Sequence, residues 1–208
     1  MLFIAASFDV KKAVTNITNA EEAVISCENH GFEDGDIVQI YSGWGRLNHR
    51  AVRVKNATLD SFVAEEIDTR NTTFFPSGTG AGSVRKVLEF IQISKYLNPS
   101  ISGGDPKPVT VKFMDEDTET TLNDGFSAVT ESFEIDADQF GTPAYQAMVE
   151  LSESQTDTIL KKVLKSGDMI FTPCTIALNE NVKLAEGSIM TNSVAVNGNG
   201  RITRYNKQ

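Results

Sequence analysis

The sequence predicts a mainly β fold, a β-sandwich or barrel with one short α-helix. Three observations predict it. Short apolar, β-branched runs recur roughly every 10–15 residues between turn-forming residues. Residues 51–55 alternate apolar and polar side chains with the period of two that is typical of a half-buried strand. A single segment, 143–153, carries apolar residues at convincing helical spacing.

The N-terminal part predicts a first strand and a small β-module. Residues 1–6 are apolar, but they are few, have no basic leader and are soon followed by Asp9, so they indicate a strand rather than a signal peptide. Apolar runs then alternate with Gly- and Asp-rich turns. They predict strands at 23–27, 36–41, 51–55 and 61–64.

The segment 75–83 interrupts this pattern, since three of its nine residues are glycine and one is proline. Its Gly78-x-Gly80-x-Gly82 spacing superficially suggests a phosphate-binding loop, but the Gly-Lys-Ser/Thr ending is absent. A flexible linker is the better interpretation. We therefore expect two domains. Residues 1–83 comprise the first strand, the module at 17–75 and the linker, and residues 84–208 form the larger domain.

The larger domain is predicted to contain a long acidic β-hairpin over 109–138, because apolar residues alternate at 109–113 and again at 133–135. Nine acids and no Lys or Arg lie between Phe113 and Asp138. Such a stretch concentrates negative potential and repels nucleic-acid phosphate. Taken alone, it is more typical of a solvated hairpin or a mobile loop. Calcium binding is disfavoured, because the EF-hand spacing is absent.

The helix at 143–153 has its own start signals. Thr142 can cap its N-terminus and Pro143 suits its first turn. Ala144, Ala147, Met148 and Leu151 would share one buried face. A helix of about three turns needs a sheet to pack against. The remaining apolar runs predict strands at 159–164, 169–176, 189–196 and 202–205.

Composition excludes several function classes. The 208 residues include 19 Lys and Arg against 28 Asp and Glu, a net charge of −9, which is unsuited to broad neutralisation of nucleic-acid phosphates. No apolar run approaches the roughly 20 residues of a membrane span. Two cysteines and two histidines offer no disulfide framework or metal site. No catalytic triad or carboxylate pair stands out. We therefore expect no enzyme activity, catalytic residue, cofactor, metal or membrane partner.

Two residue clusters in the module have competing interpretations. Trp44, the single tryptophan, lies beside Arg46 in a glycine-flanked loop. An exposed Trp44–Arg46 pair would be a contact point for another protein, whereas a buried Trp44 would be a lid over the module core. His30 lies between turn residues and is predicted to hydrogen-bond the local backbone rather than to bind a metal.

Two segments of the sequence resemble the tail tube proteins of long-tailed, siphovirus-type bacteriophages or prophages. The first contains His30-Gly31-Phe32-x-x-Gly35-Asp36 and then Ser42-Gly43-Trp44-Gly45-Arg46-Leu47-Asn48. Similar His-Gly modules occur in other phage structural proteins and in ubiquitin-activating enzymes, and the second string narrows the resemblance to the tail tube group. The other segment is 75–87. The resemblance covers residues 17–87, about a third of the chain, and the N-terminus looks short for the group.

The resemblance implies a structural virion protein that is made in the host bacterial cytoplasm and assembles into the tail. Such subunits form stacked homohexameric rings, whose inner strands close a barrel around an acidic lumen that conducts DNA without binding it specifically. A loop or arm reaches the next ring. Implied partners are other copies, the baseplate or initiator, the terminator and the tape measure protein. Among the acids of the hairpin, Asp115, Asp117 and Glu119 share strand parity and are our candidates for lining the lumen.

Two other classes of function remain open from the sequence. One is another phage particle protein, such as a tail terminator or a decoration module, which would have no need of the long hairpin. The other is an enzyme with an unrecognised site, which would need a pocket of titratable residues.

Overall fold

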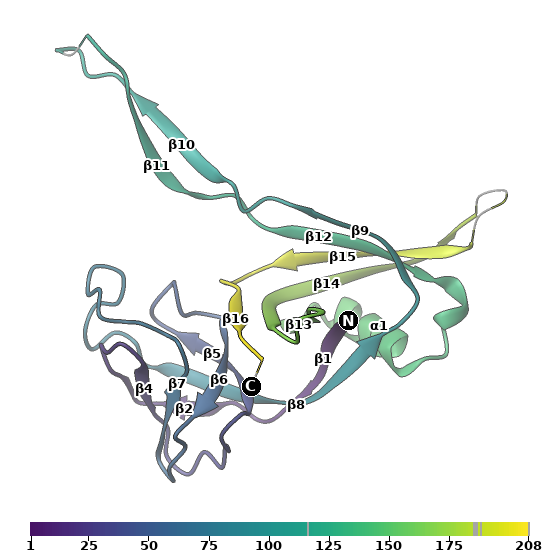
Figure 1. Cartoon of the computed structure of the whole chain (residues 1–208), viewed down its shortest axis with the longest axis horizontal. Coiled ribbons are helices and arrows are strands. Elements are labelled where there is room, and N and C mark those ends of the chain that lie inside the picture. Colours follow the sequence, from purple (N-terminus) through teal and green to yellow (C-terminus); the bar gives the residue numbers. More distant parts are fainter. Residues whose placement is uncertain (116, 185–186, 188, 208) are drawn as a thin grey trace.

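The computed structural model describes residues 1–115, 117–184, 187 and 189–207. The chain is mostly β-strand, and a large curled antiparallel sheet forms a half-barrel with a single α-helix on its inner side (Figure 1). The predicted fold class is therefore confirmed. The first strands are β1 (Leu2–Phe8), β2 (Lys12–Val14), β3 (Asn16–Ile17), β4 (Ala23–Ser26), β5 (Ile37–Ser42), β6 (Ala51–Lys55), β7 (Ser61–Ala64) and β8 (Gly82–Ile93).

The second half of the chain holds the remaining elements. A short 3-10 helix, η1 (Ala137–Gln139), precedes helix α1 (Pro143–Ser154). No described helix is both long and apolar enough to cross a membrane. The strands are β9 (Tyr96–Ser102), β10 (Pro106–Val111), β11 (Thr120–Phe126), β12 (Thr130–Asp136), β13 (Thr158–Val163), β14 (Met169–Lys183), β15 (Thr191–Gly198) and β16 (Thr203–Tyr205).

The described strands of the main sheet follow the order β3-β4-β7-β6-β5-β8-β1-β13-β14-β15-β12-β9, with β16 beside β14 and β2 beside β8. Strand β8 pairs with strands of both the module and the larger domain. Its first residues pair with β5 of the module, and its last residues pair with β1 of the larger domain. The domain boundary that the sequence predicts near residue 83 therefore lies inside a continuous strand.

The segment that the sequence predicts as a flexible linker is packed against the module. Trp44 Nε1 donates to the Pro76 carbonyl at 2.8 Å, and Ser42 Oγ donates to the Gly80 carbonyl at 2.8 Å. A Cβ at Gly80 would lie 3.0 Å from the Trp44 ring. The interpretation of this segment as a flexible linker is wrong. Its glycines allow the backbone to pack closely against the module and do not act as points of flexibility.

Helix α1 forms as predicted. The Thr142 hydroxyl accepts from the Tyr145 amide, proline occupies the first turn, and Gln155 ends the helix in the left-handed region at φ 51°. Its buried face packs onto β14, β1 and β8 in the core of the larger domain. The helical members of that core are Ala144, Tyr145, Met148 and Leu151.

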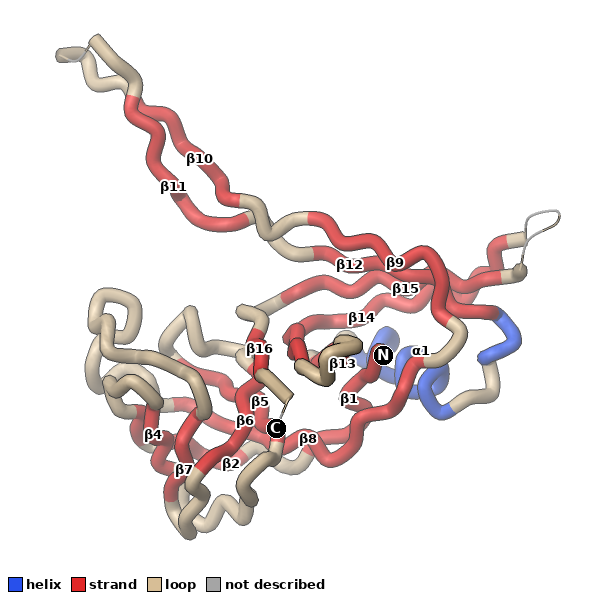
Figure 2. Tube along the Cα trace, in the orientation of Figure 1, coloured by secondary structure: helices blue, strands red, loops and turns tan. Residues whose placement is uncertain are grey.

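The long hairpin is built differently from the prediction. Strand β10 pairs with β11, whereas β12 pairs with β9, and Figure 2 shows loops interrupting both arms at their junction. Gly103 permits this junction at φ 83°, where a Cβ would lie 1.9 Å from the Ala128 carbonyl oxygen. Residues 98–102 contribute most of β9, although Pro99 lies within this strand. Strands β9 and β12 belong to the main sheet, whereas β10 and β11 form a separate two-stranded hairpin that projects from it (Figure 1).

Candidate functional site

One face of the sheet formed by β9, β12, β15 and β14 consists almost entirely of short polar or small side chains. The registers align them in rows across the four strands. Taken across the sheet from β9 to β14, one row is Ser102, Thr130, Asn197 and Thr175. The next row is Ser100, Ser132, Ala195 and Ala177. We call this surface the polar face.

The opposite face of the same strands is apolar. Phe133 and Ile135 from β12, and Val194 and Val196 from β15, are buried in the core that includes α1. Because successive side chains of a strand point to opposite faces, this burial fixes which residues form the polar face. Since α1 covers the apolar face, the polar face is directed away from the helix.

The charges near the polar face are paired. The carboxylate of Glu134 accepts from Lys183 Nζ at 2.7 Å and from Asn98 Nδ2 at 2.9 Å. These hydrogen bonds, the one from Lys183 first, lower the pKa of Glu134 below 4.5. Asp136 lies 3.7 Å from Lys95 Nζ. Glu131 pairs with Lys162 on the apolar side and is 8% exposed. The acidic stretch seen in the sequence therefore does not form an acidic stripe on this face.

Two unpaired strand edges border the polar face. Strand β9 bonds to β12 on one side and ends the described sheet on the other. Strand β14 pairs with β13 only as far as Cys174, so its residues 175–183 have a neighbouring strand on one side alone. Helix α1 covers part of that edge, because Ser152 Oγ accepts from the Leu178 amide at 3.1 Å. Pro99 in β9 is typical of an edge strand.

The candidate lumen residues Asp115, Asp117 and Glu119 lie in the loop between β10 and β11, at the tip of the projecting hairpin. These three acids do not share one face of a strand, as the sequence predicts, because this segment is not a strand. The tip is distant from the polar face (Figure 2). The hairpin also exposes large apolar side chains, namely Val109, Phe113, Met114, Leu122 and Phe126.

Trp44 is 1% exposed, and its ring packs edge-on against Phe75 at 5.3 Å between centroids. The structure therefore shows the lid over the module core, and the interpretation of Trp44 as an exposed contact is wrong. Arg46 is partly exposed and lies over the Phe74 ring at 3.1 Å. The module can bury Trp44 because a carbonyl and a hydroxyl within it accept hydrogen bonds from the indole N–H.

The histidine and cysteine environments are structural. His30 Nδ1 accepts from the Phe32 amide at 2.9 Å, and Nε2 lies 3.2 Å from the Ser61 carbonyl, as predicted for a turn histidine.

Cys27 and Cys174 are buried free thiols, and burial raises the pKa of Cys174 to about 12. Across the part of the chain that the structure describes, no group of three or more His, Cys, Asp or Glu side chains is arranged to hold a metal ion.

The model of the family described as "Phage tail tube protein, TTP" matches residues 42–207 of this chain. The chain belongs to the phage tail tube protein family. The matched range begins in the module and contains the polar face, helix α1 and the projecting hairpin. Members of this family are structural proteins of the virion tail, so the resemblance seen in the sequence is confirmed.

Solved structures similar to the chain come from gene transfer agent (GTA) particles. One is titled "Tail of empty GTA particle computed with helical refinement, C6 symmetry", with 12% identity and a TM-score of 0.44 over 56% of this chain and 86% of the other. Another, the virion of a native GTA particle, shows 12% identity and a TM-score of 0.45 over 57% and 90% of the two chains. No curated protein matches the chain.

Sequence reasoning missed the polar face. Its signal is present in the alternation of Ser193, Ala195 and Asn197 with Val194 and Val196. This pattern also fits any strand with one solvent-exposed face. Only the register shows that small polar residues from four strands form one continuous surface.

Proposed function

We propose that six copies of this tail tube protein form a ring in which the polar faces line the lumen, and that stacked rings form the tube through which DNA passes. The observation that carries this proposal is the polar face itself, a four-strand surface with short side chains and two strand edges at its borders. The proposal also includes other tail proteins, such as an initiator, a terminator and a tape measure protein, at the ends and in the interior of the tube.

The chemistry of the polar face suits a conduit. A surface that holds DNA uses Lys and Arg against phosphates and long or aromatic groups against bases. The central rows of this face have hydroxyl, amide and methyl groups instead. Lys183, at one end of β14, is paired with Glu134. The excess of acids over the whole chain adds a repulsive field for phosphate.

The two strand edges that lack a neighbouring strand in the described sheet support ring closure. Exposed edges readily accept another strand, and closing a barrel removes them. The order β9-β12-β15-β14 is antiparallel throughout, so rotation about an axis parallel to the strands brings β9 of one copy antiparallel to β14 of the next. Six such four-strand units would then form one continuous antiparallel barrel.

The hairpin of β10 and β11 supports contacts between rings. An isolated two-stranded hairpin is at best marginally stable in water. This one projects from the sheet and exposes Phe113, Met114, Leu122 and Phe126. Burial against a neighbouring copy along the tube axis would cover these side chains. The acids at its tip would then face that copy or the solvent rather than the lumen wall formed by the sheet.

Cysteine labelling tests the lumen assignment directly. Ser132→Cys places a thiol on the polar face, and Glu28→Cys places one on an exposed turn of the module. Both native thiols are buried and should not react. Purified protein is concentrated, examined by negative-stain electron microscopy for rings and tubes, and treated with a maleimide that carries a long polyethylene glycol chain.

We expect both variants to react as monomers, and only the Glu28→Cys variant to react fully after assembly. Equal labelling of Ser132→Cys in tubes and in monomers would show that the polar face lies outside the lumen. A protein that forms neither rings nor tubes at any concentration would instead favour a terminator or decoration role.

A further inference from the structure

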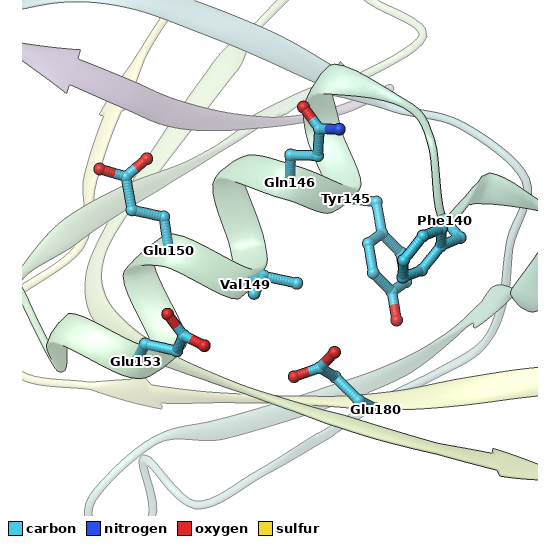
Figure 3. Close-up of a pocket in the computed structure, with 7 residues that line it drawn as sticks. All are labelled: Phe140, Tyr145, Gln146, Val149, Glu150, Glu153 and Glu180. Atoms are coloured by element: carbon cyan, nitrogen blue, oxygen red, sulfur yellow. The ribbon is translucent and has the colours of Figure 1, made fainter.

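A pocket of about 260 Å³ lies between helix α1 and strand β14 (Figure 3). Val149, Phe140 and Tyr145 supply its apolar part, and Phe140 is 68% exposed. Three carboxylates surround it, Glu150 and Glu153 from the helix and Glu180 from the strand. None of the three has a cationic partner within 4 Å among the described residues.

Tyr145 adds a hydrogen-bonding group to this acidic pocket. Its side chain is 2% exposed, yet its hydroxyl points into the pocket toward Glu180 and has no hydrogen-bond partner in the described part of the chain. Burial first, and then the charge of Glu180, raise the pKa of Tyr145. A polar group bound in the pocket would find a hydrogen-bonding partner in this hydroxyl.

A second cluster of unpaired charge has the opposite sign. Arg46 and Arg50 from the module lie near Arg201, two residues before β16. Arg50 Nε donates to Thr203 Oγ1 at 3.0 Å, and a Cβ at Gly200 would lie 3.2 Å from the Asn48 carbonyl oxygen, so this part of the module packs against residues 200–203. Desolvation, followed by the charge of Arg201, lowers the pKa of both module arginines. No described carboxylate lies within 4 Å of any of the three. Phe74 and Ile202, each 41% exposed, add apolar surface beside this basic cluster.

The two clusters lie in different parts of the molecule. Figure 1 shows α1 at one end of the elongated body and the module strands at the other. A chain with a net charge of −9 therefore leaves three arginines unneutralised in one place and three glutamates unneutralised in another. Each cluster combines charge with exposed aromatic or aliphatic side chains, which is the composition of a protein contact surface.

We propose that the acidic pocket of one copy binds the basic cluster of the next copy around the ring. Complementary charge favours a head-to-tail contact, because a two-fold symmetric contact through either cluster would oppose like charges. An arginine side chain would place its guanidinium among the carboxylates and its stem over Phe140, and it would donate to the Tyr145 hydroxyl. This inference rests on the proposed tube function and names the contact between its subunits.

Charge reversal tests the contact. One variant carries Glu150→Lys with Glu180→Lys, and a second carries Arg46→Glu with Arg201→Glu. The matched control, Glu28→Lys with Glu33→Lys, changes the net charge as the first variant does, at exposed positions of the module. Ring and tube formation is measured by sedimentation velocity and electron microscopy at low and high salt.

We expect each reversed variant alone to assemble at least about tenfold more weakly than wild type, and the control to assemble normally. An equimolar mixture of the two reversed variants should assemble again. Each contact in an alternating ring then pairs opposite charges, and a six-membered ring permits strict alternation. In that mixture a carbodiimide should link the introduced lysines to the introduced glutamates, which peptide mass spectrometry identifies.

Normal assembly of both reversed variants, equal loss in the control, or a mixture that neither assembles nor cross-links would overturn this contact. Wild-type rings would still support the tube function in each of those cases. If the wild type forms no rings, the tube function fails, and the cross-link in the mixture still decides the contact on its own.

Discussion

The Tyr205 hydroxyl donates to the backbone carbonyl of Glu65 at 3.1 Å and so fastens the C-terminal strand to the module. The same hydroxyl accepts from the Arg53 amide at 2.8 Å. Burial raises the pKa of Tyr205 to about 12, so the hydroxyl keeps its proton at neutral pH. The last strand of the larger domain thereby completes hydrogen bonds that belong to the module.

Tyr205→Phe should destabilise the chain by about 1–3 kcal/mol, because it leaves a buried amide and a carbonyl without a partner. The ring contact with Phe171 at 6.1 Å would remain. Urea unfolding followed by circular dichroism measures the effect. Tyr96→Phe is the control, since Tyr96 is 37% exposed and its hydroxyl has no partner in the described structure. Equal free energies of unfolding for the two variants would show that the hydrogen bonds of the Tyr205 hydroxyl do not stabilise the contact between the C-terminal strand and the module.

Gly80→Ala should destabilise the module by about 1–3 kcal/mol, because the added Cβ would press on the Trp44 ring at 3.0 Å. The intrinsic fluorescence of this single tryptophan reports the unfolding of its surroundings. Gly45→Ala is the matched change, since a Cβ there meets nothing within 4 Å. If both variants unfold like wild type, the segment 75–83 is freer than its contacts imply.

The Glu134–Lys183 pair should make stability fall in acid. The pKa of Glu134 is lower in the folded chain than the value of 4.5 for a free side chain. The contribution is therefore complete above the unfolded pKa and is lost as the pH falls through the folded pKa. Carboxyl carbon shifts measured by NMR across a pH titration give the folded value. Lys183→Gln should raise the pKa of Glu134, and the control Lys107→Gln should leave it unchanged. An unchanged pKa of Glu134 in the Lys183→Gln variant would contradict the pairing.

Replacing residues 106–126 by Asn-Gly should leave the monomer as stable as wild type, because β10 and β11 pair only with each other. The Ser127 amide already donates to the Asp105 carbonyl at 2.9 Å, so a short turn fits there. We expect rings without long tubes in negative-stain images. Tubes of normal length from this variant would exclude the hairpin from ring stacking.

The sequence by itself determined most elements of this protein. Alternation, turn residues and the Thr142–Pro143 start signal located the helix and many of the strands to within a few residues, because these signals act over short distances. They did not locate β2, β3 or β9. The motifs at 30–36 and 42–48 also indicated the family. Local signals fail where the same local pattern is compatible with two kinds of packing. The sequence around Trp44 fits either an exposed or a buried side chain, and the glycines at 78–82 fit either a flexible linker or a closely packed segment.

Tertiary structure alone decided which strands meet. The pairing of β9 with β12 places Ser100 beside Ser132 and moves Asp115, Asp117 and Glu119 to a projecting tip. The sequence assigned those acids to a strand, because acidity and parity are visible locally and register is not. Register depends on hydrogen bonds between segments far apart in the chain. For that reason the polar face, the acidic pocket and the basic cluster became visible only when the folded sheet and helix brought their residues together.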